Sequence, residues 1–152
     1  MSRRQPGRRA EYARCEPVPI RWADSDIYGH MNNAVHYYLF DTAVQAVLVR
    51  DGLLDLGRSD AVFLVVSSGC DFFGEILFGD RVEAGLRIGR LGSSSVRWEI
   101  GVCRNDADRA AAEGFFVHVN VGRADRRPRP LSDRAREVLR PLVISGGGAQ
   151  PK

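Results

Sequence analysis

The sequence has few cysteines, and they form no motif. Cys15, Cys70 and Cys103 are far apart, and no Cys-x-x-Cys pair occurs. This pattern argues against a disulfide framework and against a zinc knuckle, and it favours a reducing compartment. No apolar run reaches the length needed to cross a membrane, and the early arginines are followed by no apolar core. We therefore expect a cytoplasmic protein with no membrane partner.

Several common catalytic motifs are also missing. The sequence contains no Gly-x-Ser-x-Gly elbow, no Gly-x-x-x-x-Gly-Lys loop and no Gly-x-Gly-x-x-Gly after a strand. Lysine is almost absent. Of the 22 lysine and arginine residues, only Lys152 is a lysine. The arginines are spread along the chain, the net charge is only +3, and no nucleic-acid motif accompanies them. A nucleic-acid partner is therefore not expected.

The composition is that of one globular domain. The chain has 152 residues, of which 44% are hydrophobic and 27% charged, which is enough for a full core. We expect residues 1–15 to form a basic, flexible N-terminal arm. Residues 16–142 would form the domain, and residues 143–152, which are rich in glycine, a disordered tail.

The strand pattern is antiparallel. A first short strand is expected at Glu16–Trp22 and a second over Ala61–Phe73. Apolar and polar residues then alternate over Val82–Ile88, Val96–Val102 and Phe115–Val121, with turns between them. A short helix is expected at Ser132–Arg140. Five strands and one early long helix predict an α+β protein, because no crossover helices join the later strands.

The long helix and the loop before it carry the chemistry. Ala34–Val49 has few polar side chains, so we expect a helix that is mostly enclosed. Asn32 or Asn33 is a natural N-cap, and Gly29 allows a sharp turn before it. A helix start offers unpaired N–H donors and a positive dipole end, which suit a carbonyl oxygen that gains negative charge.

The loop resembles a known family signature. Asp26-Ile-Tyr-Gly29-His30-Met-Asn32-Asn33, followed by an apolar helix, is similar to the hot-dog-fold acyl-CoA thioesterases related to 4-hydroxybenzoyl-CoA thioesterase. The resemblance spans roughly residues 18–141. It implies a curved antiparallel five-stranded sheet wrapped around a long central helix. It also implies an active site between two subunits.

The resemblance assigns catalysis to the loop. Asp26 stands where the family has the aspartate that acts on the thioester, either as nucleophile or as general base for a water. His30 is a candidate for orienting the water or the thioester. Gly29, with the N–H groups just after it, is a candidate oxyanion site. Asp24 is expected to be structural, holding the loop or pairing with Arg21.

Candidate substrate-binding residues lie in two places. Tyr28, Asn32 and Asn33 belong to the loop, where we interpret Asn33 as a helix cap first and a ligand second. Arg90, Ser93, Ser94 and Arg97 resemble the segment that contacts the nucleotide of coenzyme A in the family. The arginines of 123–129 are a second candidate, because phosphates need cationic donors.

The sequence thus predicts an acyl-CoA thioesterase that needs no cofactor and no metal, and forms a homodimer or homotetramer. An acyl-carrier-protein thioesterase and a non-catalytic hot-dog module that only binds acyl-CoA are the alternatives. A hot-dog hydratase would be distinguished by adding water to an enoyl-CoA without releasing a thiol. His30-Met-Asn-Asn differs from the hydroxybenzoyl branch, so the aromatic substrate of that branch is not expected here.

Overall fold

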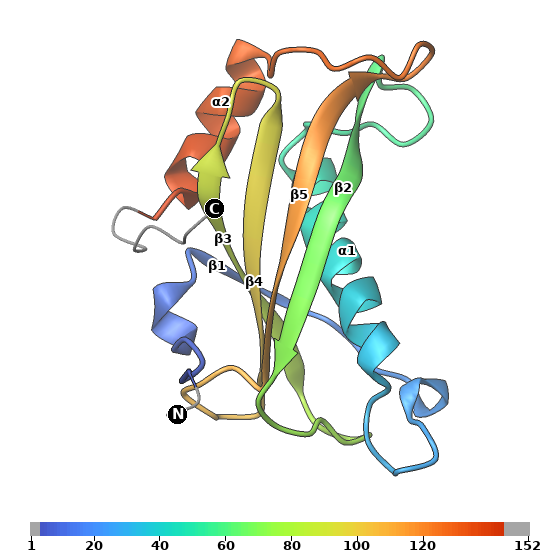
Figure 1. Ribbon diagram of the computed structural model, residues 1–152, viewed down its shortest axis with the longest axis vertical. Coiled ribbons are helices and arrows are strands. Elements are labelled where there is room, and N and C mark those ends of the chain that lie inside the picture. Colours follow the sequence, from blue (N-terminus) through green and yellow to red (C-terminus); the bar gives the residue numbers. More distant parts are fainter. Residues whose placement is uncertain (1–3, 145–152) are drawn as a thin grey trace.

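The computed structural model describes residues 4–144, which contain five strands and two α-helices (Figure 1). The strands are β1 (Arg14–Pro17), β2 (Ala61–Phe72), β3 (Val82–Leu91), β4 (Ser95–Arg104) and β5 (Ala112–Gly122). The helices are α1 (Asn33–Arg50) and α2 (Asp133–Leu139), and short 3-10 turns cover Arg9–Glu11, Trp22–Asp24 and Arg140–Leu142.

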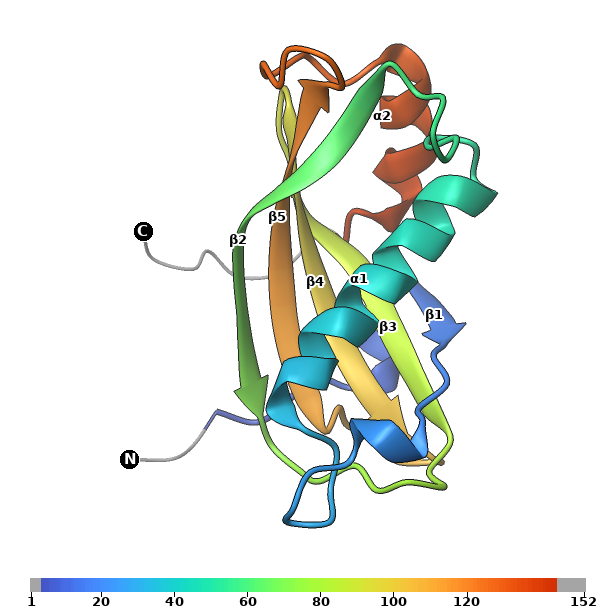
Figure 2. The same ribbon diagram turned by 90° about the vertical axis from the view of Figure 1, so that its right-hand side faces the viewer.

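One antiparallel sheet holds the strands in the order β1-β3-β4-β5-β2. It curves around α1, which crosses one of its faces (Figure 2). This arrangement confirms the expected hot-dog fold. β2 is an edge strand, because it pairs only with β5.

The core lies between α1 and the sheet. The alternation of apolar and polar residues predicted the inward positions of β3 and β4, and these positions are buried. The helix α1 contributes the other side of the core. The main contributors are Phe40, Val44, Val47 and Leu48 from α1, and Leu86, Ile88, Trp98 and Ile100 from the sheet. Gly52, with a φ of 76°, ends α1 as expected, and its N–H donates to the Val49 carbonyl.

Two expectations about local structure were wrong. The first strand is Arg14–Pro17 and does not reach Trp22, because Pro17 and Pro19 have no N–H for the ladder; the N–H of Val18 still donates to Val82. The helix α1 is also less enclosed than its sequence suggested. Tyr38 and Val49 are exposed on the face that turns away from the sheet.

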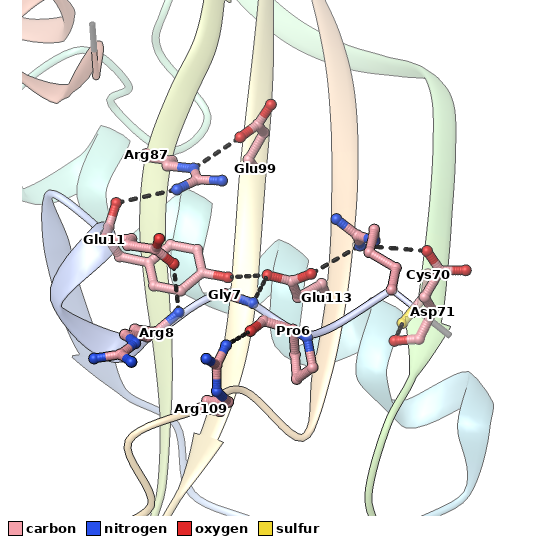
Figure 3. A network of polar contacts seen from close by, with 12 residues as sticks. Pro6, Gly7, Arg8, Glu11, Cys70, Asp71, Arg87, Glu99, Arg109 and Glu113 are labelled. Atoms are coloured by element: carbon pink, nitrogen blue, oxygen red, sulfur yellow. Dashed lines mark hydrogen bonds and ion pairs between the residues drawn. The ribbon is translucent and has the colours of Figure 1, made fainter. Parts of the chain in front are cut away.

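The described part of the basic arm before β1, residues 4–13, lies against the face of the sheet opposite α1 (Figure 3). Its anchor is the buried ring of Tyr12, whose hydroxyl donates to Glu113 at 2.9 Å. Glu113 also accepts from the N–H of Gly7 and from Arg4. Burial, followed by the charge of Glu113, raises the pKa of Tyr12. This segment is therefore part of the packed structure.

The chain returns to the sheet after α2. Val143 makes a parallel bridge with Ile88, so the first residue of the predicted tail contacts the sheet. The rest of that prediction, residues 145–152, lies outside the described residues. Within residues 4–144, neither helix has the length and apolar character required to span a bilayer.

Candidate functional site

The loop between β1 and α1 is held from both sides. As expected, Asp24 is structural: its buried carboxylate accepts from the backbone N–H of Arg21 at 2.7 Å and from the Arg21 guanidinium at 2.8 Å. These bonds lower the pKa of Asp24. The Asp24 carbonyl accepts from Asn32, and the N–H of Met31 donates to Ile76 at 2.7 Å. The loop is thus fastened at its start, at the helix and to the β2–β3 connection.

Asp26 begins a tight turn inside this loop. The N–H of Tyr28 donates to its Oδ1 at 2.9 Å, and the Gly29 N–H donates to its carbonyl at 3.1 Å. Gly29 has a φ of 83°, a conformation that favours glycine. The side chain of Asp26 is 18% exposed, so it does not project into bulk solvent. Its Oδ2 has no N–H donor within the described residues and is the free oxygen of the pair.

His30 faces Asp26 across the turn. The N–H of Asp26 donates to the His30 carbonyl, and Ser25 bridges Met31. The His30 Nδ1 lies 3.9 Å from Asp26 Oδ2 and 3.3 Å from the Met31 carbonyl oxygen. Tyr28 stacks on the His30 ring, with ring centroids 6.2 Å apart. The structure therefore brings Asp26, Tyr28, Gly29 and His30 together.

The start of α1 is capped by Asn32, and the expectation that Asn33 is the cap was wrong. The Asn32 Oδ1 accepts from the N–H of Ala34 at 2.9 Å, while Asn33 is the exposed first residue of the helix. The Gly29 N–H is occupied by Asp26, as described above. Within residues 4–144, the N–H groups of Ile27, His30 and Asn33 have no acceptor, and those of His30 and Asn33 lie just before and at the start of α1.

A hollow of about 480 Å³ opens beside Asp26 and Gly29. Its walls come from the turn before the loop and from the β2–β3 connection: Trp22, Ala23, Ser25, Leu77 and Phe78. Sequence reasoning missed these walls. The weak signal was Leu77-Phe78 directly before the Gly79-Asp80 turn, where two large apolar residues stand in a position that is usually polar.

The predicted coenzyme A residues lie at the other end of the sheet. Arg90, Ser93, Ser94 and Arg97 belong to the β3–β4 hairpin, whereas the loop meets the opposite end near Ile76 (Figure 1). The Arg97 guanidinium stacks on Phe115, 4.0 Å from the ring centroid.

The arginines of 123–129 lie at the same end as this hairpin. The N–H of Leu131 donates to Ser93, and the N–H of Asn120 donates to Ser94. Arg123 donates to the Ser59 carbonyl just before β2. Within one chain, the two groups of candidate arginines therefore lie at the same end of the sheet, and both lie at the opposite end from Asp26.

Two other ionisable side chains, His36 and Cys70, are buried or partly buried. His36, in the first turn of α1, is buried and contacts Phe72 edge to face, and burial lowers its pKa. Burial raises the pKa of the Cys70 thiol to about 12, which disfavours a nucleophilic thiolate. No group of three or more His, Cys, Asp or Glu side chains within residues 4–144 is arranged to hold a metal ion.

Comparisons with known proteins agree with this architecture. Residues 20–139 match the Thioesterase-like superfamily. The PA5185 protein of Pseudomonas aeruginosa is 42% identical, with a TM-score of 0.90 over 93% of this chain and 99% of that one. A Thermus thermophilus thioesterase in complex with coenzyme A and Zn is 34% identical, with a TM-score of 0.72 over 87% of this chain and 95% of that one. The Bacillus subtilis protein YsmA is 20% identical over 80% of this chain and 82% of its own length.

Proposed function

We propose, since this chain belongs to the thioesterase-like superfamily, that it hydrolyses an acyl-coenzyme A thioester to the free carboxylic acid and coenzyme A. The observation that carries the proposal is the position of Asp26. Its free Oδ2 lies in a tight turn beside an apolar hollow, directly before the start of α1. A Thermus relative with a similar fold binds coenzyme A, which supports this carrier.

The carbonyl oxygen of the thioester would be polarised by the helix start. The N–H of Asn33 is an unpaired donor in the first turn of α1, and the N–H of His30 is unpaired just before it. Both gain from the positive end of the helix dipole, and such donors stabilise the negative oxygen of a tetrahedral intermediate. In this proposal Gly29 acts through the turn it permits, while Asn32 fixes the helix start.

Asp26 would cleave the thioester by one of two routes. As a nucleophile, Oδ2 attacks the carbonyl carbon, the C–S bond breaks, coenzyme A leaves as the thiol after protonation, and water hydrolyses the mixed anhydride. As a general base, Oδ2 takes a proton from water while that water attacks, and the proton passes to the leaving sulfur. A burst of thiol ahead of acid release would identify the first route.

The activity is tested by thiol release. We expect free coenzyme A from a panel of short, medium and long acyl-CoAs, at rates well above those of acyl-carrier-protein substrates. Faster release from the carrier protein would assign the alternative carrier. Tight binding of acyl-CoA without any thiol release would contradict hydrolysis and indicate a binding module.

We further propose that two copies pair through β2 and complete the site. Leu64, Val65 and Val66 are exposed on this long edge strand, and Tyr38 is exposed on α1. Long apolar edge strands are normally covered by a partner strand. A two-fold axis through an antiparallel β2–β2 pair would bring the start of one β2 beside the end of the other.

Such a pair accounts for the distance between Asp26 and the arginines. Arg123 lies at the start of β2, and the end of β2 is near the loop, because Phe72 contacts His36. The arginines of 123–129 of one copy would therefore approach the Asp26 loop of the other more closely than the β3–β4 hairpin does. We propose that they bind the phosphates of coenzyme A.

A pair of variants separates the two arginine candidates. Arg127→Ala is expected to raise KM for acyl-CoA about tenfold with little change in kcat, since one charged hydrogen bond to phosphate is worth about 1.5 kcal/mol. Arg90→Ala should leave KM within about twofold. The reverse result would place the nucleotide at the hairpin.

A further inference from the structure

The walls of the hollow beside Asp26 are apolar. Trp22 and Phe78 contact each other edge to face with their ring centroids 5.5 Å apart, and Leu77 lies beside them. Among residues 4–144, Asp26 is the only charged residue that lines the hollow. Pockets of this size and character bind small ligands through their apolar parts.

The two sides of the hollow, Trp22 on one and Leu77 with Phe78 on the other, are held in place although these side chains are exposed. Trp22 is 74% exposed and opens a short turn that the Arg21–Asp24 bonds fix. Leu77 and Phe78 lie in a turn closed by Asp80, whose Oδ2 accepts from the N–H of Leu77 at 2.8 Å. Asn105 donates to the other oxygen of Asp80, and these bonds lower the pKa of that carboxyl. Large apolar side chains gathered and fixed at the surface mark a binding surface.

The charge of the hollow limits what can enter it. The nearest arginine in sequence, Arg21, is bound to Asp24 and does not line the hollow. An acyl group that ends in a carboxylate would find no cation among the described residues of this chain that line the hollow, and would be repelled by Asp26. An uncharged chain or ring would instead gain roughly fourfold in binding for each methylene that it buries.

We propose that Trp22, Leu77 and Phe78 form the acyl-binding site, and that the enzyme selects thioesters of uncharged, apolar acyl groups over those ending in a carboxylate. This inference rests on the proposed thioesterase function. It adds the substrate class and the residues that set it.

Kinetics with matched substrates test the selection. Hexanoyl-CoA and adipoyl-CoA have the same chain length and differ in a terminal carboxylate. We expect kcat/KM to be at least about a hundredfold higher for hexanoyl-CoA, because the carboxylate would be desolvated without a partner. Phe78→Arg should narrow this ratio at least about tenfold. Leu56→Ala, which removes an exposed leucine outside the hollow, should not change it.

Binding can be followed without hydrolysis. The protein has two tryptophans, of which Trp98 is 0% exposed and Trp22 is open to solvent. S-hexyl-CoA, a thioether that cannot be hydrolysed, should shift the fluorescence of Trp22 to the blue by covering its indole. The shift should disappear in Trp22→Phe.

The kinetic measurement and the fluorescence measurement together distinguish the possible outcomes. Hydrolysis with equal rates for hexanoyl-CoA and adipoyl-CoA, and no fluorescence shift, would overturn the acyl site while leaving the thioesterase function intact. A Trp22 shift without hydrolysis of any ester would overturn the function and support the apolar site. A preference that persists unchanged in Phe78→Arg would overturn the assignment of these residues.

Discussion

His118 is a fully buried imidazole on the inner side of β5, between Phe63 and Phe116. Neither of its ring nitrogens has a hydrogen-bond partner among the described residues. Burial lowers its pKa to about 4, and the charge of Asp41 offsets only part of this effect. The folded protein therefore keeps this side chain neutral where an unfolded chain would bind a proton.

The pH dependence of stability follows from this shift. The unfolded histidine titrates near 6.5, so the contribution of His118 is complete above that pH and is lost as the pH falls towards 4. We expect the free energy of unfolding to drop by about 2 kcal/mol between pH 7 and pH 4.5 through this residue. Urea titrations across this range should show a flatter profile in His118→Leu. His36 shifts in the same direction and keeps part of the slope. An unchanged profile in the variant would contradict this account.

The proximity of individual residues could be predicted where those residues are close in the sequence. Asp26, Gly29 and His30 are neighbours in sequence, so their proximity followed from one short loop. Trp22 and Phe78 are far apart in the sequence. They come into contact because the loop is bound to the β2–β3 connection by the hydrogen bond from the Met31 N–H to the Ile76 carbonyl. Of the predicted oxyanion donors, the Gly29 N–H is bonded to the Asp26 carbonyl, which only the coordinates show, whereas the N–H of His30, just after it, has no acceptor within residues 4–144.

At the scale of elements, two glycines of the sheet allow the N-terminal segment to pack closely against it. Gly85 and Gly101 are paired across β3 and β4, and the Tyr12 ring lies over both. A Cβ on Gly101 would lie 2.2 Å from ring atoms of Tyr12. The glycines thus leave the space that Tyr12 fills, and Arg87 covers the ring at 5.1 Å.

Gly101→Ala is expected to destabilise the protein by about 1–3 kcal/mol, because the methyl group displaces Tyr12 and the backbone of a strand otherwise accepts alanine. Tyr12→Ala should also destabilise it. The double variant should lose clearly less than the sum of the two, as expected for residues in contact. Urea denaturation measures all three. Strict additivity would show that the methyl group and the ring do not meet.

Elements with clear alternation were predictable, and those without it were less so. β3 and β4 alternate apolar and polar residues, and their positions and inward faces followed, although both strands extend beyond the predicted Val82–Ile88 and Val96–Val102. In β5 the inward residues include His118 and Asn120, so polarity alone did not reveal which face is buried. The helix α1 was placed within a residue at each end, but its exposed face was missed because the apolar Tyr38 and Val49 lie there together with the polar Asp41 and Thr42.

At the scale of the whole molecule, we expect the exposed apolar residues of the β2 edge to be covered by a second copy of the chain. Val66 is 62% exposed and lies at the point where the β2–β5 register shifts. We expect Val66→Lys to convert a dimer to a monomer, since a charge on an edge strand opposes pairing. Light scattering after gel filtration measures the mass.

Cys15→Lys is the matched control for this variant. It places the same charge on β1, the opposite edge of the sheet, where Cys15 is exposed. The mass should remain that of a dimer. If Val66→Lys keeps the dimer mass while Cys15→Lys loses it, the pairing edge is β1 and the proposed route for coenzyme A phosphates is wrong.

The most direct test of the central claim is the rate of thiol release by Asp26→Asn. The amide keeps the size of the side chain but can neither attack the carbonyl nor take a proton from water, so kcat should fall by at least about a hundredfold. Asp106→Asn, which changes a carboxylate that is 98% exposed and pairs only with Arg81, should retain the wild-type rate. An Asp26→Asn protein that releases coenzyme A as fast as the wild type would contradict the role assigned to this loop.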